Sequence, residues 1–225
     1  MTQSNQALPA PVPCALRMES AGTGATVAAV TPCFTPGTTI ATPKGNRPVE
    51  TLCEGDQVIT RDNGMQTIKW AGRRTILRAE LLNSPQLRPI LIKAGALGDD
   101  LPQRDMMVSP HHRMLVAGER TKLHFREAEV LVEAKHLVNH NSIRWVDTLR
   151  TTYIHFMCER HEIVMGDGVW TESFQPDDLS LGGLCDGQRN EILRVFPELE
   201  TAKGLESYQT ARRALTGSEA VMLQK

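Results

Sequence analysis

Short apolar runs separated by turn residues dominate the chain from Cys33 onward and predict β-strands. The clearest pair is a hairpin in which Asn63-Gly64 joins residues 58–60 to residues 66–70, because Asn-Gly supplies the positive φ that a tight turn requires. Other runs of this kind lie at residues 38–41, 49–52, 57–60, 90–93, 106–109, 113–117, 142–145, 152–157, 161–165 and 169–170. Many short strands at close spacing predict an all-β domain.

After Phe174 the apolar period changes to 3.6 residues and predicts helices. Asp186 is placed to cap a first helix, which Pro197 ends. The apolar faces consist of Ile192, Leu193 and Phe196 in the first helix and of Ala202, Leu205, Tyr208, Ala211 and Leu215 in a second. We therefore expect residues 174–225 to form a C-terminal helical extension that packs on the β domain or on a protein partner.

The first 32 residues show neither pattern. They are rich in Gln, Pro, Ala, Ser, Thr and Gly, and Arg17 and Glu19 are their charged side chains. Such a composition predicts a flexible leader. The expected organisation is thus a leader over residues 1–32, a β domain over 33–173 and a helical extension over 174–225.

Charge and hydropathy exclude some classes of partner. The 225-residue chain has 25 Lys and Arg against 26 Asp and Glu, a net charge of -1, so no general field attracts nucleic acid or an anionic membrane. No apolar run approaches the ~18 residues of a membrane span. The N-terminus also lacks the basic segment and apolar core of a secretory signal. We expect a cytoplasmic protein, or one exported without a classical signal peptide.

The five cysteines are odd in number, scattered and without a C-x-x-C pair. This pattern indicates neither a disulfide framework nor a zinc ribbon. Cys53, Cys158 and Cys185 lie in or beside apolar stretches and are expected to be small buried hydrophobic residues. Cys33 needs a separate explanation.

The segment 33–38 (CFTPGT) opens the β region directly after the leader, and the segment 109–112 (SPHH) follows on a later strand. Together they supply a thiol at the boundary of a movable segment, with a hydroxyl at Ser109 and an imidazole at His112. These are the groups needed for nucleophilic attack on a peptide carbonyl.

In these segments the sequence resembles the Hint superfamily, the fold shared by inteins and by the autoprocessing domain of Hedgehog proteins, and most closely the bacterial Hint-domain proteins. The resemblance covers roughly residues 33–173. It rests on segments 33–38, 45–58 with Gly55-Asp56, the hairpin through Trp70, 109–112, and 161–164 (HEIV) running to Trp170. It implies a flattened, pseudo-symmetric β disc with the reactive cysteine on its first strand.

The resemblance also implies a reaction. The thiol of Cys33 attacks the carbonyl of Pro32 and converts the peptide bond between them into a thioester, with the chain's own N-terminal segment as substrate and no cofactor. Ser109 hydrogen-bonds around that peptide, and His112 polarises or protonates the departing nitrogen. His161, in the later block that closes the site, is a candidate for a second role.

Two positions depart from the pattern of inteins. Inteins resolve the thioester with a terminal His-Asn pair, whereas residues 169–173 read VWTES, so we expect hydrolysis or transfer without splicing. In addition, the ring of Pro32 fixes the backbone at the attacked carbonyl. The alternatives are a catalytically degenerate Hint module with a structural or protein-interaction role, and a cysteine hydrolase that cleaves a separate peptide.

The other histidines give weaker indications. His136 and His140 stand at i, i+4 spacing, which could present two imidazoles on one helix face to a metal. The H-E-x-x-H pattern and an obvious third ligand are missing, so no metal is expected. His124 and His155 are interpreted as structural, and strand alternation places His111 at the surface.

Overall fold

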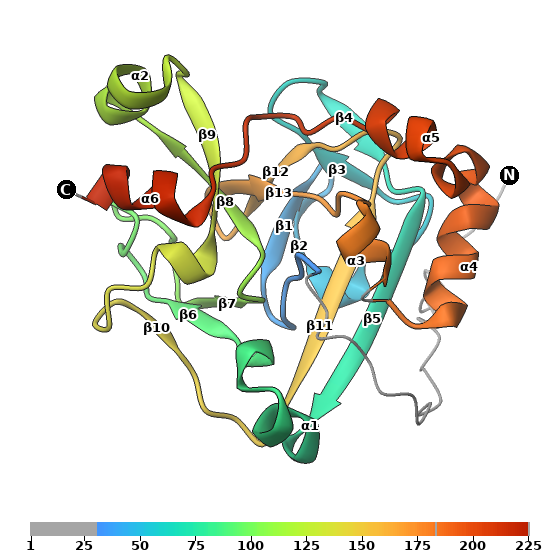
Figure 1. The fold of residues 1–225 in the computed structure, drawn as a ribbon, viewed down its shortest axis with the longest axis horizontal. Coiled ribbons are helices and arrows are strands. Elements are labelled where there is room, and N and C mark those ends of the chain that lie inside the picture. The colour runs from blue at the N-terminus through green and yellow to red at the C-terminus, as the bar shows by residue number, and fades with distance from the viewer. Residues whose placement is uncertain (1–30, 183, 225) are drawn as a thin grey trace, which may run out of the picture.

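The computed structural model describes residues 31–182 and 184–224, and most of its regular structure is β (Figure 1). The strands are β1 Thr39–Thr42, β2 Gly45–Pro48, β3 Gln57–Ile59, β4 Met65–Thr67, β5 Trp70–Leu77, β6 Ile90–Ile92, β7 Met106–Val108, β8 Arg113–Ala117, β9 Glu129–Glu133, β10 Ile143–Trp145, β11 Arg150–Met157, β12 Ile163–Gly166 and β13 Val169–Glu172. The helices are α1 Arg78–Asn83, α2 Glu119–Phe125, α3 Asp178–Gly182, α4 Asp186–Val195, α5 Ala202–Ser207 and α6 Gly217–Gln224. Short 3-10 turns are η1 Val49–Thr51, η2 Pro85–Leu87, η3 Ala134–His136 and η4 Pro197–Glu200.

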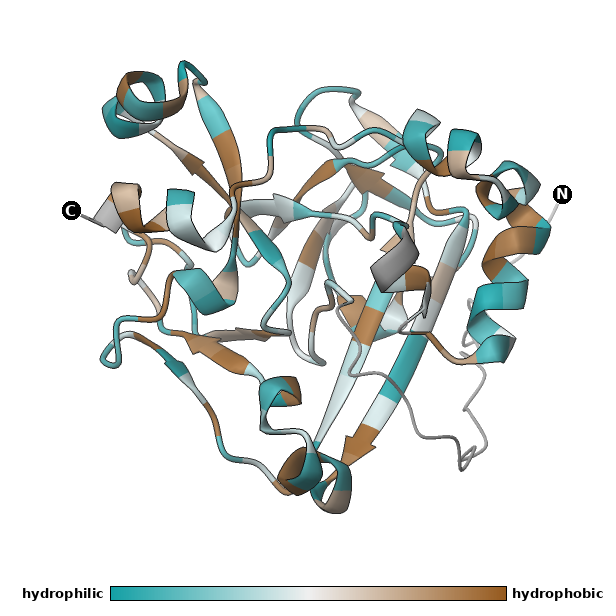
Figure 2. Cartoon of the chain, viewed as in Figure 1, coloured by the Kyte–Doolittle hydropathy of each residue, from teal (hydrophilic) through white to brown (hydrophobic). Residues whose placement is uncertain are grey.

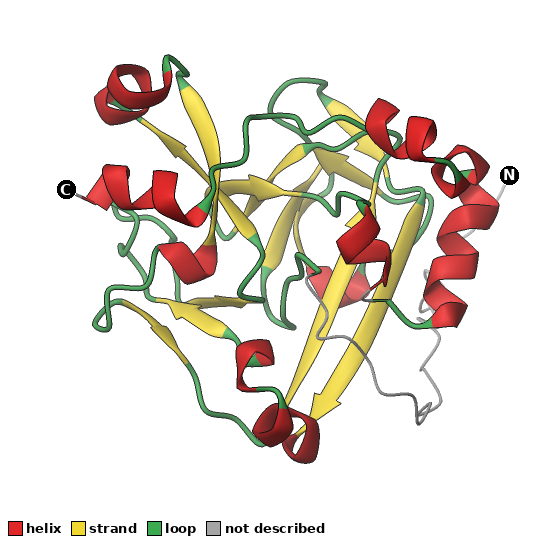
Figure 3. Cartoon of the chain, viewed as in Figure 1, coloured by secondary structure: helices red, strands yellow, loops and turns green. Residues whose placement is uncertain are grey.

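The strands are grouped in four sets. A six-stranded sheet has the order β2-β1-β12-β13-β8-β9, a three-stranded sheet the order β10-β6-β7, and β5 pairs with β11 and β3 with β4. The β5–β11 pair is the longest and keeps an unbroken antiparallel register from Trp70 opposite Met157 to Leu77 opposite Arg150. Figure 3 shows the strands at the centre of the molecule and most helices around its periphery.

Most of the predicted strands are present, with shifts of a residue or two. The hairpin at Asn63-Gly64 is confirmed: Val58 pairs with Gln66, and Gly64 has the positive φ of 64° that the turn requires. The strand predicted at residues 49–52 is wrong, because Val49–Thr51 forms a 3-10 turn in which Val49 alone is buried. The domain boundaries and the flattened disc shape stay predictions, and the leader prediction falls almost wholly on residues 1–30, outside the described part of the chain.

Apolar and polar residues alternate along several strands, as the colours of the ribbon in Figure 2 show. The apolar positions supply the core of the β region. One cluster packs around Phe34 and joins β1, β3, β11 and β12. Its buried members are Phe34, Ile40, Val49, Leu52, Val58, Ile68, Ile154, Phe156, Cys158 and Val164. This cluster fixes the chain immediately after Cys33.

The helix predicted to begin at Asp186 is α4, which covers the β5–β11 pair, but its N-cap is Cys185 and not Asp186. Ile192 and Phe196 lie in a buried cluster with Trp70 of β5 and Met157 of β11. The β domain itself therefore covers this apolar face. The second predicted helix is wrong in part: it ends at Ser207, and the chain then runs extended, with Ala214 bridged to Leu131 of β9, before α6 begins. Within the described residues, no helix has the length and apolar content to cross a membrane.

The structure corrects two of the cysteine predictions. Cys158 is a buried free thiol, as expected. Cys185 is only half-buried, and its sulfur caps α4 by accepting a hydrogen bond from the amide of Gln188 at 3.5 Å. Cys53 is half-buried and disulfide-bonded, so the expectation of a free buried thiol is wrong there.

The packing of α4 on the β5–β11 pair predicts the effect of shortening Ile192, which is fully buried. We expect Ile192→Ala to lower the free energy of unfolding by about 2–5 kcal/mol, through lost apolar contact and the cavity it leaves. Urea denaturation followed by circular dichroism measures this change. The matched control is Val195→Ala on the same helix, at a side chain 40% exposed, with an expected change of about 0.5 kcal/mol or less. Equal losses in the two variants would contradict the packing described.

Candidate active site

A β-bridge at Phe34 places Cys33 between two strands that are distant in the sequence. Phe34 exchanges two backbone hydrogen bonds with Ile154 of β11, at 2.8 and 2.9 Å, and forms a second bridge with Val108 at the end of β7. Residues adjacent to bridged pairs are neighbours in space. Cys33 therefore lies beside Ser109, which follows Val108, and beside His155, which follows Ile154.

Ser109 holds the backbone on both sides of Pro32. Its hydroxyl oxygen accepts a hydrogen bond from the backbone amide of Cys33 at 2.9 Å, and the hydroxyl donates to the carbonyl of Thr31 at 2.9 Å. The amide of Ser109 donates in turn to the carbonyl of Cys33 at 2.9 Å. The peptide bond between Pro32 and Cys33 is thus fixed in position by one buried side chain.

The imidazole of His155 lies against the thiol, a contact that the sequence did not predict. Its Nδ1 lies 3.3 Å from the Sγ of Cys33, and the same sulfur lies 3.3 Å from the carbonyl oxygen of Thr31. The imidazole ring stacks on Trp70, with centroids 5.1 Å apart and planes 17° apart. This stacking holds the ring in position toward Cys33.

Burial controls the protonation of this pair. Cys33 and His155 are each 3% exposed. Burial raises the pKa of the Cys33 thiol far above its usual range and lowers the pKa of the His155 imidazole to about 4. Near neutral pH both groups are therefore uncharged. A thiolate does not form in advance, so the thiol proton must move to an acceptor as the sulfur attacks.

His112 lies behind Phe34 rather than at the thiol. Its ring meets the ring of Phe34 edge-on with centroids 4.4 Å apart. Its Nε2 lies 2.6 Å from the hydroxyl of Thr171, and that hydroxyl donates to the carbonyl of Arg113 at 2.8 Å. The proton shared with Thr171 therefore sits on Nε2 of His112.

This protonation leaves Nδ1 of His112 as a bare acceptor. The atom is buried and has no hydrogen-bond partner among the described residues. Burial lowers the pKa of His112 to about 4. The resemblance implies a general acid at His112. The neutral ring has no proton on Nδ1 to donate, so it must first accept one there.

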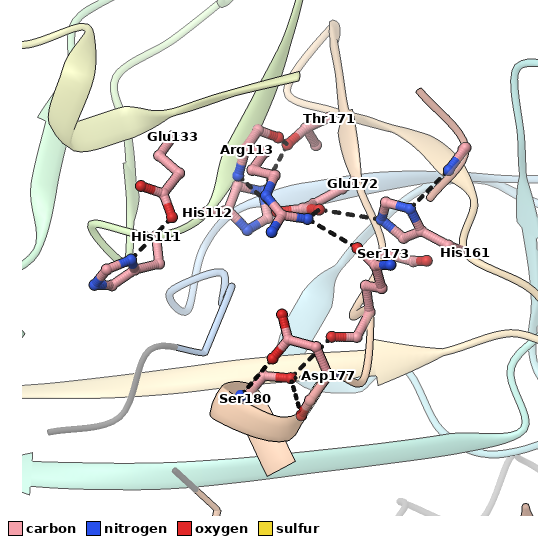
Figure 4. A network of polar contacts seen from close by, with 12 residues as sticks. His111, His112, Arg113, Glu133, His161, Thr171, Glu172, Ser173, Asp177 and Ser180 are labelled. Atoms are coloured by element: carbon pink, nitrogen blue, oxygen red, sulfur yellow. Dashed lines mark hydrogen bonds and ion pairs between the residues drawn. The ribbon is translucent and has the colours of Figure 1, made fainter. Parts of the chain in front are cut away.

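His161 belongs to a separate buried network, shown in Figure 4. Its Nε2 lies 3.1 Å from a carboxylate oxygen of Glu172, and its Nδ1 accepts a hydrogen bond from the backbone of Ala211 at 3.0 Å. Glu172 also accepts from the backbone and side chain of Arg113, at 2.8 and 3.3 Å. The structure does not bring His161 to Cys33. It ties the C-terminal extension to β13.

The structure corrects the surface position expected of His111. His111 is half-buried, between Glu133 at 3.0 Å and Lys135 at 3.1 Å, and is not a freely exposed surface residue. His136 ends the 3-10 turn η3, whereas His140 lies in a loop at a left-handed φ of 61°. The two imidazoles therefore share no helix face. Among the described residues, no group of three or more His, Cys, Asp or Glu side chains is arranged to hold a metal ion.

A small cavity adjoins the thiol. Its volume is about 20 Å³, and its lining includes Thr31, Cys33, Tyr153, His155 and Gln188. A space of this size holds about one water molecule. Gln188 comes from α4, so the C-terminal extension contributes to the wall of the site, which the sequence did not predict.

These features define a class of protein. A cysteine that opens the β region and is fixed beside a Ser-x-x-His segment is the arrangement that the resemblance to the Hint superfamily implies. The model of the Hint domain family matches residues 32–178. The chain belongs to this family, and membership supports a self-processing fold in general.

Several solved structures resemble the chain. A bacterial intein-like domain from Clostridium thermocellum matches with 15% identity and a TM-score of 0.43, over 63% of this chain and 97% of that one. A DnaB intein from Synechocystis sp. PCC 6803 has 9% identity and a TM-score of 0.39, over 63% and 98%. The gp41-1 intein has 10% identity and a TM-score of 0.36, over 62% and 97%. No curated protein matches the chain.

The buried network around Glu172 predicts a dependence of stability on pH. Burial by itself raises the pKa of this carboxyl, but Arg113 and the hydrogen bond of His161 outweigh it and hold the pKa below its usual value. The charged form then stabilises the fold above the ordinary value of 4.5, and this contribution is lost as the pH falls through the lower folded value. We expect Glu172→Gln to cost about 3 kcal/mol or more at pH 7, because the variant leaves a buried charge without its partner.

Urea denaturation from pH 7 down to pH 3 measures this effect. The difference in free energy of unfolding between the wild type and Glu172→Gln should shrink below pH 4.5. Glu119→Gln is the control, because the Glu119 side chain is 89% exposed in its ion pair with Lys122, and its expected effect is about 0.5 kcal/mol or less. A difference that stays constant over this range would rule out the charge of Glu172 as its source.

Proposed function

We propose that this Hint domain processes its own chain at the bond between Pro32 and Cys33, by way of a thioester and without splicing. The observation that carries the proposal is the position of the Cys33 sulfur, 3.3 Å from the His155 imidazole, while Ser109 holds the amide nitrogen of the same peptide bond at 2.9 Å. A nucleophile, a proton acceptor and a fixed scissile bond are the components of an acyl transfer.

In the first step the sulfur attacks the carbonyl carbon of Pro32. The thiol proton passes to Nδ1 of His155 as the carbon–sulfur bond forms, since neither group is charged beforehand. The carbon–nitrogen bond then breaks, and the proton returns to the nitrogen, which becomes the free amino group of Cys33. The product is a thioester that joins the Pro32 carbonyl to the Cys33 sulfur.

His112 has a supporting role in this step. Its unprotonated Nδ1 is a buried acceptor without a partner among the described residues. In the proposed step such an atom can accept the proton that the thiol gave to His155 and pass it on to the departing nitrogen, so that one proton is transferred in all. This differs from a resting general acid, because His112 begins the reaction neutral.

Hydrolysis resolves the thioester. The cavity beside Cys33 has room for about one water molecule, and in this chain β13 ends in Glu172 and is followed by Ser173. Without an Asn at that point the chain has no side-chain amide there to cyclise and release the extension. Attack by water releases residues 1–32 with a C-terminal carboxylate and restores the thiol of Cys33.

Intact-mass spectrometry of freshly made protein tests the proposal. We expect the wild type to yield a species that begins at Cys33 and, with hydroxylamine, a trapped hydroxamate on residues 1–32. Cys33→Ala should abolish both, because no other described side chain lies at the position of the sulfur. His155→Ala and His112→Ala should each slow cleavage by ~100-fold to 10,000-fold through lost proton transfer.

His124→Ala is the matched control, because His124 is exposed on α2. This variant should cleave at the wild-type rate. Wild-type protein that stays full length under excess thiol and hydroxylamine would overturn the proposal and favour the degenerate module. Turnover of an added peptide would instead support a hydrolase that acts on separate chains.

Pro32 provides a second test of the same site. Its ring restricts the backbone at the carbonyl that the sulfur must reach. We expect Pro32→Gly to raise the rate of thiol-induced cleavage after residue 32, because the carbonyl gains freedom to align with the sulfur. A time course of both proteins with excess thiol measures the rates. A lower rate in Pro32→Gly would show that the proline positions the carbonyl and does not obstruct it.

A further inference from the structure

Two buried polar atoms of residues that line the cavity beside Cys33 have no hydrogen-bond partner among the described residues. One is Nε2 of His155, on the side of the ring away from the thiol, and the other is Oε1 of Gln188 on α4. Both side chains are buried, 3% and 7% exposed respectively. Leaving a buried donor or acceptor unpaired costs about 1–3 kcal/mol, so two such atoms that line one small cavity are natural partners.

The amide of Gln188 is oriented by its surroundings. Its Nε2 donates a hydrogen bond to the carbonyl of Arg73 on β5 at 3.1 Å, so its oxygen is the atom left for another donor. Gly72 makes this approach to the strand feasible, because a Cβ at that position would lie 2.8 Å from Nε2 of Gln188 and 2.6 Å from the ring of Trp70. The buried Ile192 holds α4 against the same strand pair.

We propose that Gln188 is a positioning residue, whose Oε1 accepts the proton on Nε2 of His155 and so leaves Nδ1 bare toward the sulfur of Cys33. The inference rests on the proposed function for its consequence, since it is this tautomer that lets His155 take the thiol proton. The sulfur of Cys33 does not itself decide the tautomer, because its S–H can donate to the carbonyl of Thr31 at 3.3 Å while the sulfur accepts from Nδ1. The neighbour of Nε2 decides it: with the proton on Nδ1, Nε2 would be an acceptor. Gln188 would then meet an acceptor at Nε2 that it cannot satisfy with its oxygen.

The electrostatics of the ring agree with this assignment. Burial is the main cause that lowers the pKa of His155 to about 4, and the side chain of Gln188 acts in the opposite direction. An acceptor oxygen on Gln188 that faces an N–H of His155 raises the pKa of the imidazole in this way. The C-terminal extension therefore belongs to the active site, because it supplies the group that sets the tautomer of the base.

The ¹⁵N chemical shifts of the histidine rings in the full chain test the tautomer directly. We expect a protonated Nε2 and a bare Nδ1 at His155 in the wild type and in Gln188→Glu, which keeps an acceptor oxygen. Gln188→Met has a similar length without an acceptor and should shift His155 toward the other tautomer. Asn190→Met, on the exposed side of the same helix, should match the wild type, and His155→Ala identifies the signal.

A wild-type spectrum with the proton on Nδ1 of His155 would overturn the proposal, as would an unchanged tautomer in Gln188→Met. If Gln188→Met fails to fold, the wild type and Gln188→Glu still decide. The spectra need no cleavage, so they separate this inference from the proposed reaction. Where the wild type cleaves, Gln188→Met should slow cleavage by about 100-fold and Gln188→Glu should restore it.

Discussion

The two-way backbone pairing of Phe34 with Ile154 is the interaction on which the site depends. It places the residue before Phe34 next to the residue after Ile154, and these are the thiol of Cys33 and the imidazole of His155. The ring of Phe34 secures the pairing, since it is 2% exposed and stacks on Phe156 at 5.8 Å. Because the pairing is made by backbone atoms, the position of the cysteine follows from sheet register.

The same burial that holds this register sets the chemistry. Desolvation is the main cause of the shifted pKa values at Cys33, His112 and His155, and in each case it favours the uncharged form. A thiolate and an imidazolium formed before the reaction would each carry the cost of desolvating a buried charge. The site therefore relies on fixed geometry, in which the proton has a short path and charge develops only as bonds change.

The sequence was informative where a local pattern decides the structure. Asn63-Gly64 predicted its hairpin because glycine readily takes a positive φ, which Gly64 has in the loop between Ile59 and Met65. The second C-terminal helix was predicted too long, since Ala214 gains a bridge to Leu131 on β9, a strand that the sequence analysis did not identify. Long-range pairing of this kind overrides helical periodicity and leaves no local signal.

The contact between His155 and Cys33 was not predicted for a related reason. The spacing of Ser109 and His112 drew attention to one segment, but a distance between strands is not visible in a sequence. One signal was present: His155 is a polar residue within a run of otherwise apolar positions, on the same strand face as Tyr153 by alternation. Both side chains line the small cavity, whereas Ile154 and Phe156 pack in the core around Phe34.

The enclosure of the site by the C-terminal extension fits a reaction within one chain. Trp70 links the two parts, because its ring stacks on His155 and its indole nitrogen donates to Glu191 of α4 at 3.3 Å. An enzyme that binds a separate peptide needs an opening for it, whereas here Thr31 and the peptide bond after Pro32 already lie in the site. In the proposed reaction a water molecule must enter, and the cavity of about 20 Å³ beside the thiol has room for about one. Covering a site in this way does not obstruct the substrate, since in the proposed reaction the substrate is the chain that enters the site next to the cysteine.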